Sequence, residues 1–214
     1  MTPYATPADR ARALYRLPTA PRRNRTLEIC QAHPPLLAGG RWPGEGHVSC
    51  VVDAAPTAAL PVAAGSTLAS LRSGAQLPFG RQSFDLVTSF RFFGNAQHEL
   101  RAAVLPALNR ALKPGGYLII NSHRNPRSIA ALLHGLTGGE PSGMDLHWGK
   151  LKGLLRRHGF EIAQVLPIAA WMVRFKLQAQ AHDPRRAARL ERRYGHPIFA
   201  SMAPDVLVVA RKLG

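Results

Sequence analysis

Side chains able to hold an anion or move a proton follow the apolar run 117–120. His123 can serve as a general base, because an unperturbed imidazole titrates near roughly pH 6.5; it can equally be a polar loop histidine. Arg124 and Arg127 flank the rigid pair Asn125-Pro126, and two guanidinium groups held in this way can chelate a phosphate or a carboxylate. The alternative for both arginines is a solvated loop. The spacing therefore indicates a binding edge for an anionic group beside one candidate base.

Metal chemistry has little support in the residue pattern. Asp145 and His147 lie two residues apart but lack further ligands nearby, and Cys30 and Cys50 lack the close spacing of a zinc site. We expect no bound metal. Two cysteines are also too few for a disulfide framework, which favours a reducing cytoplasm.

The charge of the chain is strongly positive, at +16. Five of the 28 basic residues are lysines, so arginine supplies 23. One interpretation is a phosphate-rich partner, because guanidinium groups bind phosphate in bidentate fashion and a positive field speeds encounter with nucleic acid. The other, which we favour, is compositional drift toward arginine, since the arginines are spread along the chain and no nucleic-acid motif accompanies them. A nucleic-acid partner is therefore open but not favoured.

Length and hydropathy bound the architecture. A chain of 214 residues with 46% hydrophobic residues can bury one sizeable core. Basic residues, prolines or glycines interrupt every apolar stretch before the roughly 18 to 20 residues that a membrane-spanning helix needs, so we expect no membrane association.

Residues 1–25 hold six arginines and one acid and form a basic tail, with a short helix over 7–15. The remaining residues, 26–214, are expected to form one domain. Its oligomeric state stays open.

Alternating strands and helices must position these side chains. Buried strands are predicted where apolar runs are short, and helices where apolar residues recur at helical spacing. Segment 67–71 fits either element. The last strand enters from a long insertion, 168–204, and can therefore run antiparallel to the others. The pattern indicates an α/β fold with a mainly parallel sheet. The expected strands are 26–30, 48–53, 84–90, 117–121, 160–166 and 205–210, and the expected helices are 34–38, 98–112, 129–136 and 150–158.

Three short motifs occur in order at informative intervals. They are Leu77-Pro-Phe followed by Ser83-Phe-Asp85, then Leu112-Lys-Pro-Gly-Gly116, and finally Gly159-Phe160. In this order they resemble the class I S-adenosylmethionine (SAM) dependent methyltransferases, in particular the methyltransferase type 11-like group. The resemblance is most specific over 77–120. It implies a Rossmann-like, doubly wound sheet with one antiparallel C-terminal strand, an enzyme and SAM as its cofactor.

The resemblance also implies a cofactor site at the ends of the first, second and fourth strands. Glu28 stands at the family's first acid, but Cys30 and Ala32 stand where the family has glycines. Asp53 matches the carboxylate that accepts hydrogen bonds from the two ribose hydroxyls; its other interpretation is a helix cap or turn residue. The acid by which the family reads the adenine amino group is missing here, and backbone groups of Ala75 and Gln76 stand in its place. Ser89 and Phe90, at the end of the fourth strand, complete the expected cofactor contacts.

Residues after the fourth and fifth strands then fall on the acceptor side. His123 is the candidate base, and segments 122–149 and 168–204 would cover a small or medium-sized acceptor, with an anionic one as an option. Two alternatives stay open: a binding or scaffold protein that has lost SAM, in view of Cys30 and Ala32, and an RNA-directed methyltransferase or binding factor, in view of the charge. The expected acceptor contacts are Arg91, Asn95, Asn121, Arg124 and Arg127.

Overall fold

The computed structural model describes part of the chain. The described residues are 25–30, 46–53, 67–70, 77, 79–90, 92–123, 125–128, 131–132, 136, 146–168 and 196–214.

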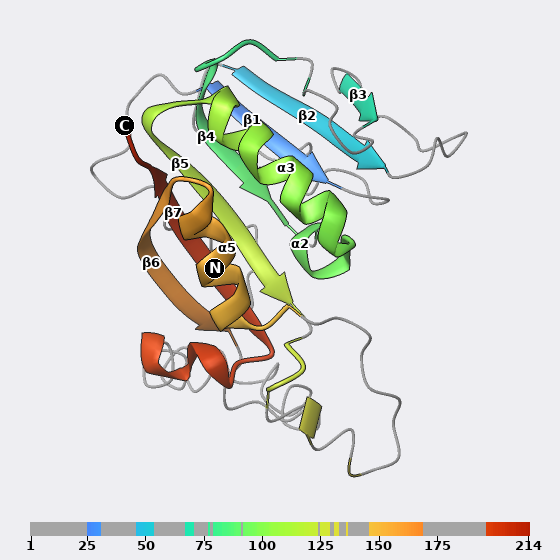
Figure 1. Ribbon diagram of the computed structural model, residues 1–214, viewed down its shortest axis with the longest axis vertical. Coiled ribbons are helices and arrows are strands. Elements are labelled where there is room, and N and C mark those ends of the chain that lie inside the picture. Colours follow the sequence, from blue (N-terminus) through green and yellow to red (C-terminus); the bar gives the residue numbers. More distant parts are fainter. Residues whose placement is uncertain are drawn as a thin grey trace, which may run out of the picture.

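The architecture is a seven-stranded sheet with the strand order β3-β2-β1-β4-β5-β7-β6 (Figure 1). The pairs joining β1 to β5 are all parallel, whereas β7 runs antiparallel to both of its neighbours, β5 and β6. This confirms the expected α/β, mainly parallel fold with one antiparallel strand near the C-terminus. The strands are β1 Arg25–Cys30, β2 Gly46–Asp53, β3 Thr67–Ser70, β4 Phe84–Ser89, β5 Leu112–His123, β6 Phe160–Ile168 and β7 Asp205–Lys212.

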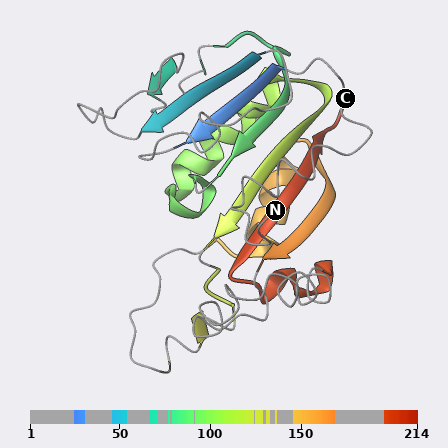
Figure 2. The same cartoon turned by 180° about the vertical axis from the view of Figure 1, so that it is seen from behind.

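Two amphipathic helices, α3 (His98–Ala111) and α5 (Trp148–Arg157), lie on the same face of the sheet. Figure 2 shows the sheet from the other side, with both helices behind it. Apolar side chains of both helices and of the inward strand positions form the core, together with the short helix α2 (Phe92–Asn95). Phe84, Phe92, Phe93 and Phe160 are fully buried in it, and burial of each contributes about 1.5–3 kcal/mol before entropy is counted.

Most expected elements occur where the residue pattern placed them, with a few differences. Of the segment 67–71, residues Thr67–Ser70 form a strand. The strand expected over 117–121 is longer, because it begins at the end of α3 and extends to His123. Ser122 and His123 are therefore strand residues and not loop residues. Helix α2 and the 3-10 helix η1 (Pro197–Ser201) were not expected. The predicted helices over 7–15 and 34–38 lie outside the described residues.

The end of α3 is closed by its own C-cap residue and by groups from two other parts of the chain. The N–H of the C-cap residue Leu112 donates to the carbonyl of Leu108 within the last turn of the helix. The carbonyls of Arg110 and Ala111 accept from the backbone N–H groups of residues 82 and 83, both at 2.8 Å. The carbonyl of Asn109 accepts from Lys212 Nζ at 2.7 Å, and the same ammonium reaches Leu112 O at 2.8 Å. All four final carbonyls of the helix are thus satisfied, which fixes α3 against β7.

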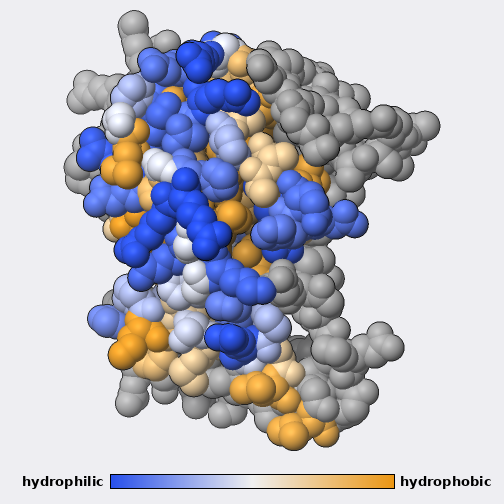
Figure 3. Space-filling view, in the orientation of Figure 1, coloured by the Kyte–Doolittle hydropathy of each residue, from blue (hydrophilic) through white to orange (hydrophobic). Residues whose placement is uncertain are grey.

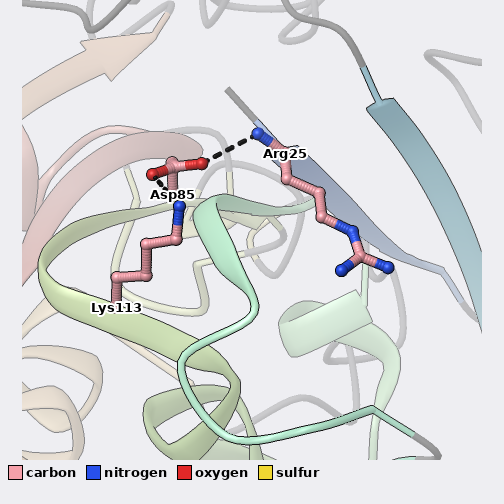
Figure 4. A network of polar contacts seen from close by, with 3 residues as sticks. All are labelled: Arg25, Asp85 and Lys113. Carbon is pink, nitrogen blue, oxygen red and sulfur yellow. Dashed lines mark hydrogen bonds and ion pairs between the residues drawn. The ribbon is translucent and has the colours of Figure 1, made fainter. Parts of the chain in front are cut away.

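The motifs that carried the family resemblance meet at the amino ends of three strands. The Asp85 carboxylate accepts a hydrogen bond from the backbone N–H of Arg25 at 2.9 Å and pairs with Lys113 Nζ at 2.8 Å (Figure 4). Gly116 lies so close to this point that a Cβ there would be 2.9 Å from Lys113 O and 3.1 Å from Asp85 O. These motif residues therefore join β1, β4 and β5 at the edge of the sheet opposite the predicted cofactor residues.

Candidate functional site

The carboxyl ends of the central strands meet at one edge of the sheet. Ile29 is the register partner of Ser89, and Cys30 is the partner of Val51, two residues before the end of β2 at Asp53. The strand order reverses between β1 and β4. In open α/β sheets a ligand binds beyond the carboxyl ends of the strands at such a switch point. The arrowheads of β1, β2 and β4 in Figure 1 mark this edge.

Polar side chains are buried in the two strands that flank the switch point. Glu28 is 1% exposed and its register partner Thr88 is fully buried. Ser89, the last residue of β4, is also fully buried, and its hydroxyl has no hydrogen-bond partner among the described residues. A buried hydroxyl left unpaired costs about 1–3 kcal/mol. A polar ligand at this edge would offset that cost, so the residues fit a cofactor rich in hydroxyl and amino groups.

The structure brings together part of the predicted cofactor set. Glu28, Cys30, Asp53 and Ser89 lie at the ends of β1, β2 and β4, and Phe90 is buried directly after β4. For Cys30 and Asp53 the backbone alone is described. Ala32, Ala75 and Gln76 lie outside the described residues. The described residues lie at the edge where the cofactor site is predicted. The contacts of all the predicted residues with a cofactor stay a prediction.

The acceptor side holds a polar pair that the sequence did not indicate. Asn121 is 1% exposed and donates to both carboxylate oxygens of Asp205, at 3.3 and 3.2 Å. Asp205 begins β7 and is the register partner of His123, the candidate base at the end of β5. No spacing rule could have found this pair, because its members are 84 residues apart and meet only through the antiparallel pairing of β5 with β7.

The loop after β5 is held to the start of β7 by one buried amide. Asn125 is 2% exposed, and its side-chain N–H groups donate to the carbonyls of Ser201 and Ala203 at 2.9 and 2.8 Å. Its side-chain oxygen accepts from the backbone N–H of Arg127 at 3.0 Å. Asn125 is therefore a structural residue, and it fixes the backbone at Arg127, whose side chain is exposed.

The remaining predicted acceptor residues have no described side-chain position. Asn95 closes α2 and His123 closes β5, each described by its backbone alone. Arg91 and Arg124 lie outside the described residues. Across the described ranges no group of three or more histidine, cysteine or acidic side chains could hold a metal ion. His147, half of the weak Asp145 and His147 pattern, caps α5 by accepting from Gly149 N–H at 3.1 Å.

Comparison with known proteins adds a family match over a third of the chain. Residues 51–120 match the methyltransferase domain family, and this range contains β3, β4, α2 and α3. A search of curated proteins finds no match. In the described part of the chain no helix is long and apolar enough to cross a membrane.

Solved structures share the fold at low sequence identity. The S-adenosylmethionine dependent methyltransferase from Mesorhizobium loti is 18% identical, with a TM-score of 0.55 over 98% of this chain and 100% of that one. A chain of the complex that contains the Haloferax volcanii Trm112 methyltransferase activator is 17% identical, with a TM-score of 0.57 over 97% and 89%. The [4+2]-cyclase SpnF is also 17% identical, with a TM-score of 0.56 over 97% and 82%.

These matches agree with the strand order, in which the switch point lies between β1 and β4 and an antiparallel β7 lies between β5 and β6. They confirm the resemblance seen in the motifs of residues 77–116. The chain has the fold of the class I SAM-dependent methyltransferases and carries a methyltransferase domain match over residues 51–120.

Proposed function

We propose that the protein is a SAM-dependent methyltransferase acting on a small or medium-sized acceptor, with an anionic acceptor as an option. The observation that carries the proposal is the edge at the switch point, where Glu28 and the unpaired hydroxyl of Ser89 are buried beside the end of β2. The methyltransferase domain match over residues 51–120 includes the end of β2 and the whole of β4, which form part of that edge. One fold hosts many reactions, so the site and not the fold alone supports the activity.

SAM, when bound, would supply an electrophilic methyl group. The protein would then need to hold the cofactor and acceptor in line and exclude water. In this proposal Asp53 accepts hydrogen bonds from the ribose hydroxyls and Glu28 supports the turn after β1. Cys30, Ala32, Ala75, Gln76, Ser89 and Phe90 complete the cofactor contacts.

Acceptor binding is assigned to the ends of β4 and β5. We place an anionic group of the acceptor against Arg91, Arg124 and Arg127, with Asn95 and Asn121 as polar contacts. Asn121 already donates to Asp205, so it would contact the acceptor as one member of the pair that these two side chains form. His123 would take a proton from an acceptor whose nucleophile carries one. Segments 122–149 and 168–204 would cover the bound acceptor, and residues 1–25 would form a basic tail.

Isothermal titration of SAM and S-adenosylhomocysteine into the full chain tests the proposal. The variant Asp53→Ala should weaken binding of both ligands by at least about tenfold, because each hydrogen bond to a charged group is worth about 1.5–3 kcal/mol. Glu161→Ala is the matched control, since Glu161 is an exposed strand acid in β6, at the far edge of the sheet. Binding that both variants weaken equally would refute the placement at β2.

A non-catalytic protein of the same fold is the second candidate. Cys30 and Ala32 stand where the family has glycines, and a side chain there takes space from a cofactor that approaches the backbone closely. A protein described as a [4+2]-cyclase has the same fold, so the fold alone does not establish methyl transfer. If neither ligand produces heat in a folded sample, this second candidate replaces the first. We also propose a cytoplasmic location, supported by the low cysteine content.

A further inference from the structure

A pocket lies at the end of α3, at the edge of the sheet opposite the predicted cofactor residues. It opens between the last two turns of this helix and the segment that enters the amino end of β4, and its volume is about 260 Å³. Figure 3 shows strongly hydrophilic residues beside apolar ones at the top of the view, where Figure 1 places the end of α3. The described residues that line the pocket are Leu77, Phe79, Arg81, Ala107, Arg110 and Ala111.

The walls of the pocket are apolar. Leu77, Ala107 and Ala111 are buried, and Phe79 packs against the core. The Phe79 ring meets the buried Phe84 ring edge to face, with the centroids 5.3 Å apart, which fixes its orientation. An apolar cavity of about 150 Å³ can hold a benzene ring. The pocket therefore has room for one aromatic ring and a polar substituent.

Two exposed arginines from different segments reach the pocket. Arg81 precedes β4, and Arg110 belongs to the last turn of α3. Their backbones are tied together, because the N–H of Gln82 donates to the carbonyl of Arg110 at 2.8 Å. The N–H of Ser83 donates to the carbonyl of Ala111, also at 2.8 Å. The two arginines therefore start from backbone positions that stay close together.

The turn that carries Arg81 has an unusual backbone. Gln82 has a φ of 54°, in the left-handed region that glycine occupies readily and glutamine rarely. The Ser83 hydroxyl closes the same turn by donating to the carbonyl of Gly80 at 2.8 Å. A strained backbone persists only where surrounding contacts fix it, and such residues gather at ligand sites. The conformation of the turn is thus a second reason, besides the cavity, to look for a ligand here.

A further cation lies near Arg81. Burial lowers the pKa of Lys212 below its usual value, and the charge of Arg81 lowers it further. Lys212 is held in place, since its ammonium donates to the carbonyls of Asn109 and Leu112 at 2.7 and 2.8 Å. An anion beside Arg81 would reduce the repulsion between these two positive charges.

We propose that this pocket binds a small carboxylate that carries one aromatic ring or an apolar group of similar size. The carboxylate bridges the guanidinium groups of Arg81 and Arg110, whose planar donors match its two oxygens. The ring lies against Phe79, Ala107 and Ala111. The site uses none of the residues assigned to the cofactor or the acceptor. It is independent of the proposed methyl transfer, and the test below contains no SAM.

Benzoate, benzamide and acetate form a matched set of probes. Benzoate carries both the ring and the charge, benzamide has the ring without the charge, and acetate has the charge without the ring. Backbone amide shifts in NMR titrations of the full chain measure the three dissociation constants. We expect benzoate to bind at least about tenfold more tightly than either other probe, because a hydrogen bond to a charged group and the burial of a ring are each worth about a factor of ten or more.

Three arginine variants and one filled pocket locate the site. Arg81→Ala and Arg110→Ala should each weaken benzoate binding at least about tenfold. Arg156→Ala is the matched control, because it removes the same charge from an exposed residue of α5 that does not line the pocket. Ala107→Leu fills the pocket while it retains both arginines, and it should abolish binding. Circular dichroism of every variant separates these effects from unfolding, and the arginine variants test the site even if Ala107→Leu does not fold.

Four results would overturn the proposal. Equal weakening by all three arginine variants would indicate diffuse attraction with no specific pocket. Acetate that binds as tightly as benzoate would mean a contact with anions in general that does not use the apolar walls. Unchanged binding in a folded Ala107→Leu variant would place the ligand elsewhere. The fourth result is no response to benzoate at about 50 mM, a concentration that saturates a site with a millimolar dissociation constant.

Discussion

Replacing Asn125 by alanine should destabilise the protein by about 3 kcal/mol. The substitution removes three hydrogen bonds made by the side chain, to Ser201 O, Ala203 O and Arg127 N. Each is worth about 1 kcal/mol net. For a domain of this size the midpoint of thermal unfolding should fall by about 6–12 °C. The loss is substantial, because a domain has only about 5–15 kcal/mol in total.

Asn125→Asp is the sharper variant, because aspartate has the same shape and retains the acceptor for the Arg127 N–H. Its second oxygen, however, would face two carbonyl oxygens and cannot donate when ionised. We therefore expect Asn125→Asp to be at least as destabilising as Asn125→Ala at pH 7. Burial should raise the pKa of the new carboxyl, so its penalty should shrink as the pH falls and the protonated acid regains a donor.

Urea denaturation at pH 7 and at pH 5 measures these differences. Two results would refute the reasoning: a cost below about 1 kcal/mol for Asn125→Ala, or an Asn125→Asp variant that is the more stable of the two at pH 7. Either would mean that the amide does not donate to the two carbonyls. Because the same amide fixes the turn at Arg127, a folded Asn125→Ala protein should also bind an anionic acceptor less tightly.

Four further predictions rest on described contacts. Lys212→Met should cost about 2 kcal/mol in urea denaturation, since two carbonyls at the end of α3 lose their donor; a cost near zero would mean that water replaces the ammonium. Gly116→Ala should cost about 1–3 kcal/mol through overpacking against backbone oxygens, and a neutral result would show that β5 can move there. Asp85→Ala should cost more than Lys113→Met, because the carboxylate also holds a backbone N–H whereas the Lys113 side chain is 46% exposed; the reverse order contradicts the geometry. Burial, and then the charge of Arg157, lower the pKa of His158 below its usual 6.5, so stability should fall as the pH drops below about 6.5, and His158→Gln should flatten that part of the curve measured by thermal unfolding.

Local patterns predicted most of the fold, because strands with apolar runs and the amphipathic α3 and α5 have signals within a few residues. The motif over 83–85 and 112–116 predicted the family. Its structural role could not be predicted, because Asp85 and Lys113 meet only when β4 pairs with β5.

The candidate site was predictable in part for a similar reason. The ends of β1, β2 and β4 follow from chain order and the switch-point rule, so Glu28, Asp53 and Ser89 could be placed at one edge. The pair of Asn121 with Asp205 and the contacts of Asn125 depend on β7, whose register no local pattern encodes. The positions of the strand ends could therefore be predicted from the sequence. The contacts that depend on the register of β7 could be seen only in the structure.

The antiparallel strand β7 has a consequence for how the protein is made. Tyr117 in β5 pairs with Arg211 in β7, so this half of the sheet closes a loop of more than ninety residues. Closing so distant a pair slows folding. Until residues 205–212 leave the ribosome, β5 has an unpaired edge and β6 has no neighbour in the sheet. We expect nascent chains that stall before residue 205 to be targets for chaperones, because they expose a long edge strand.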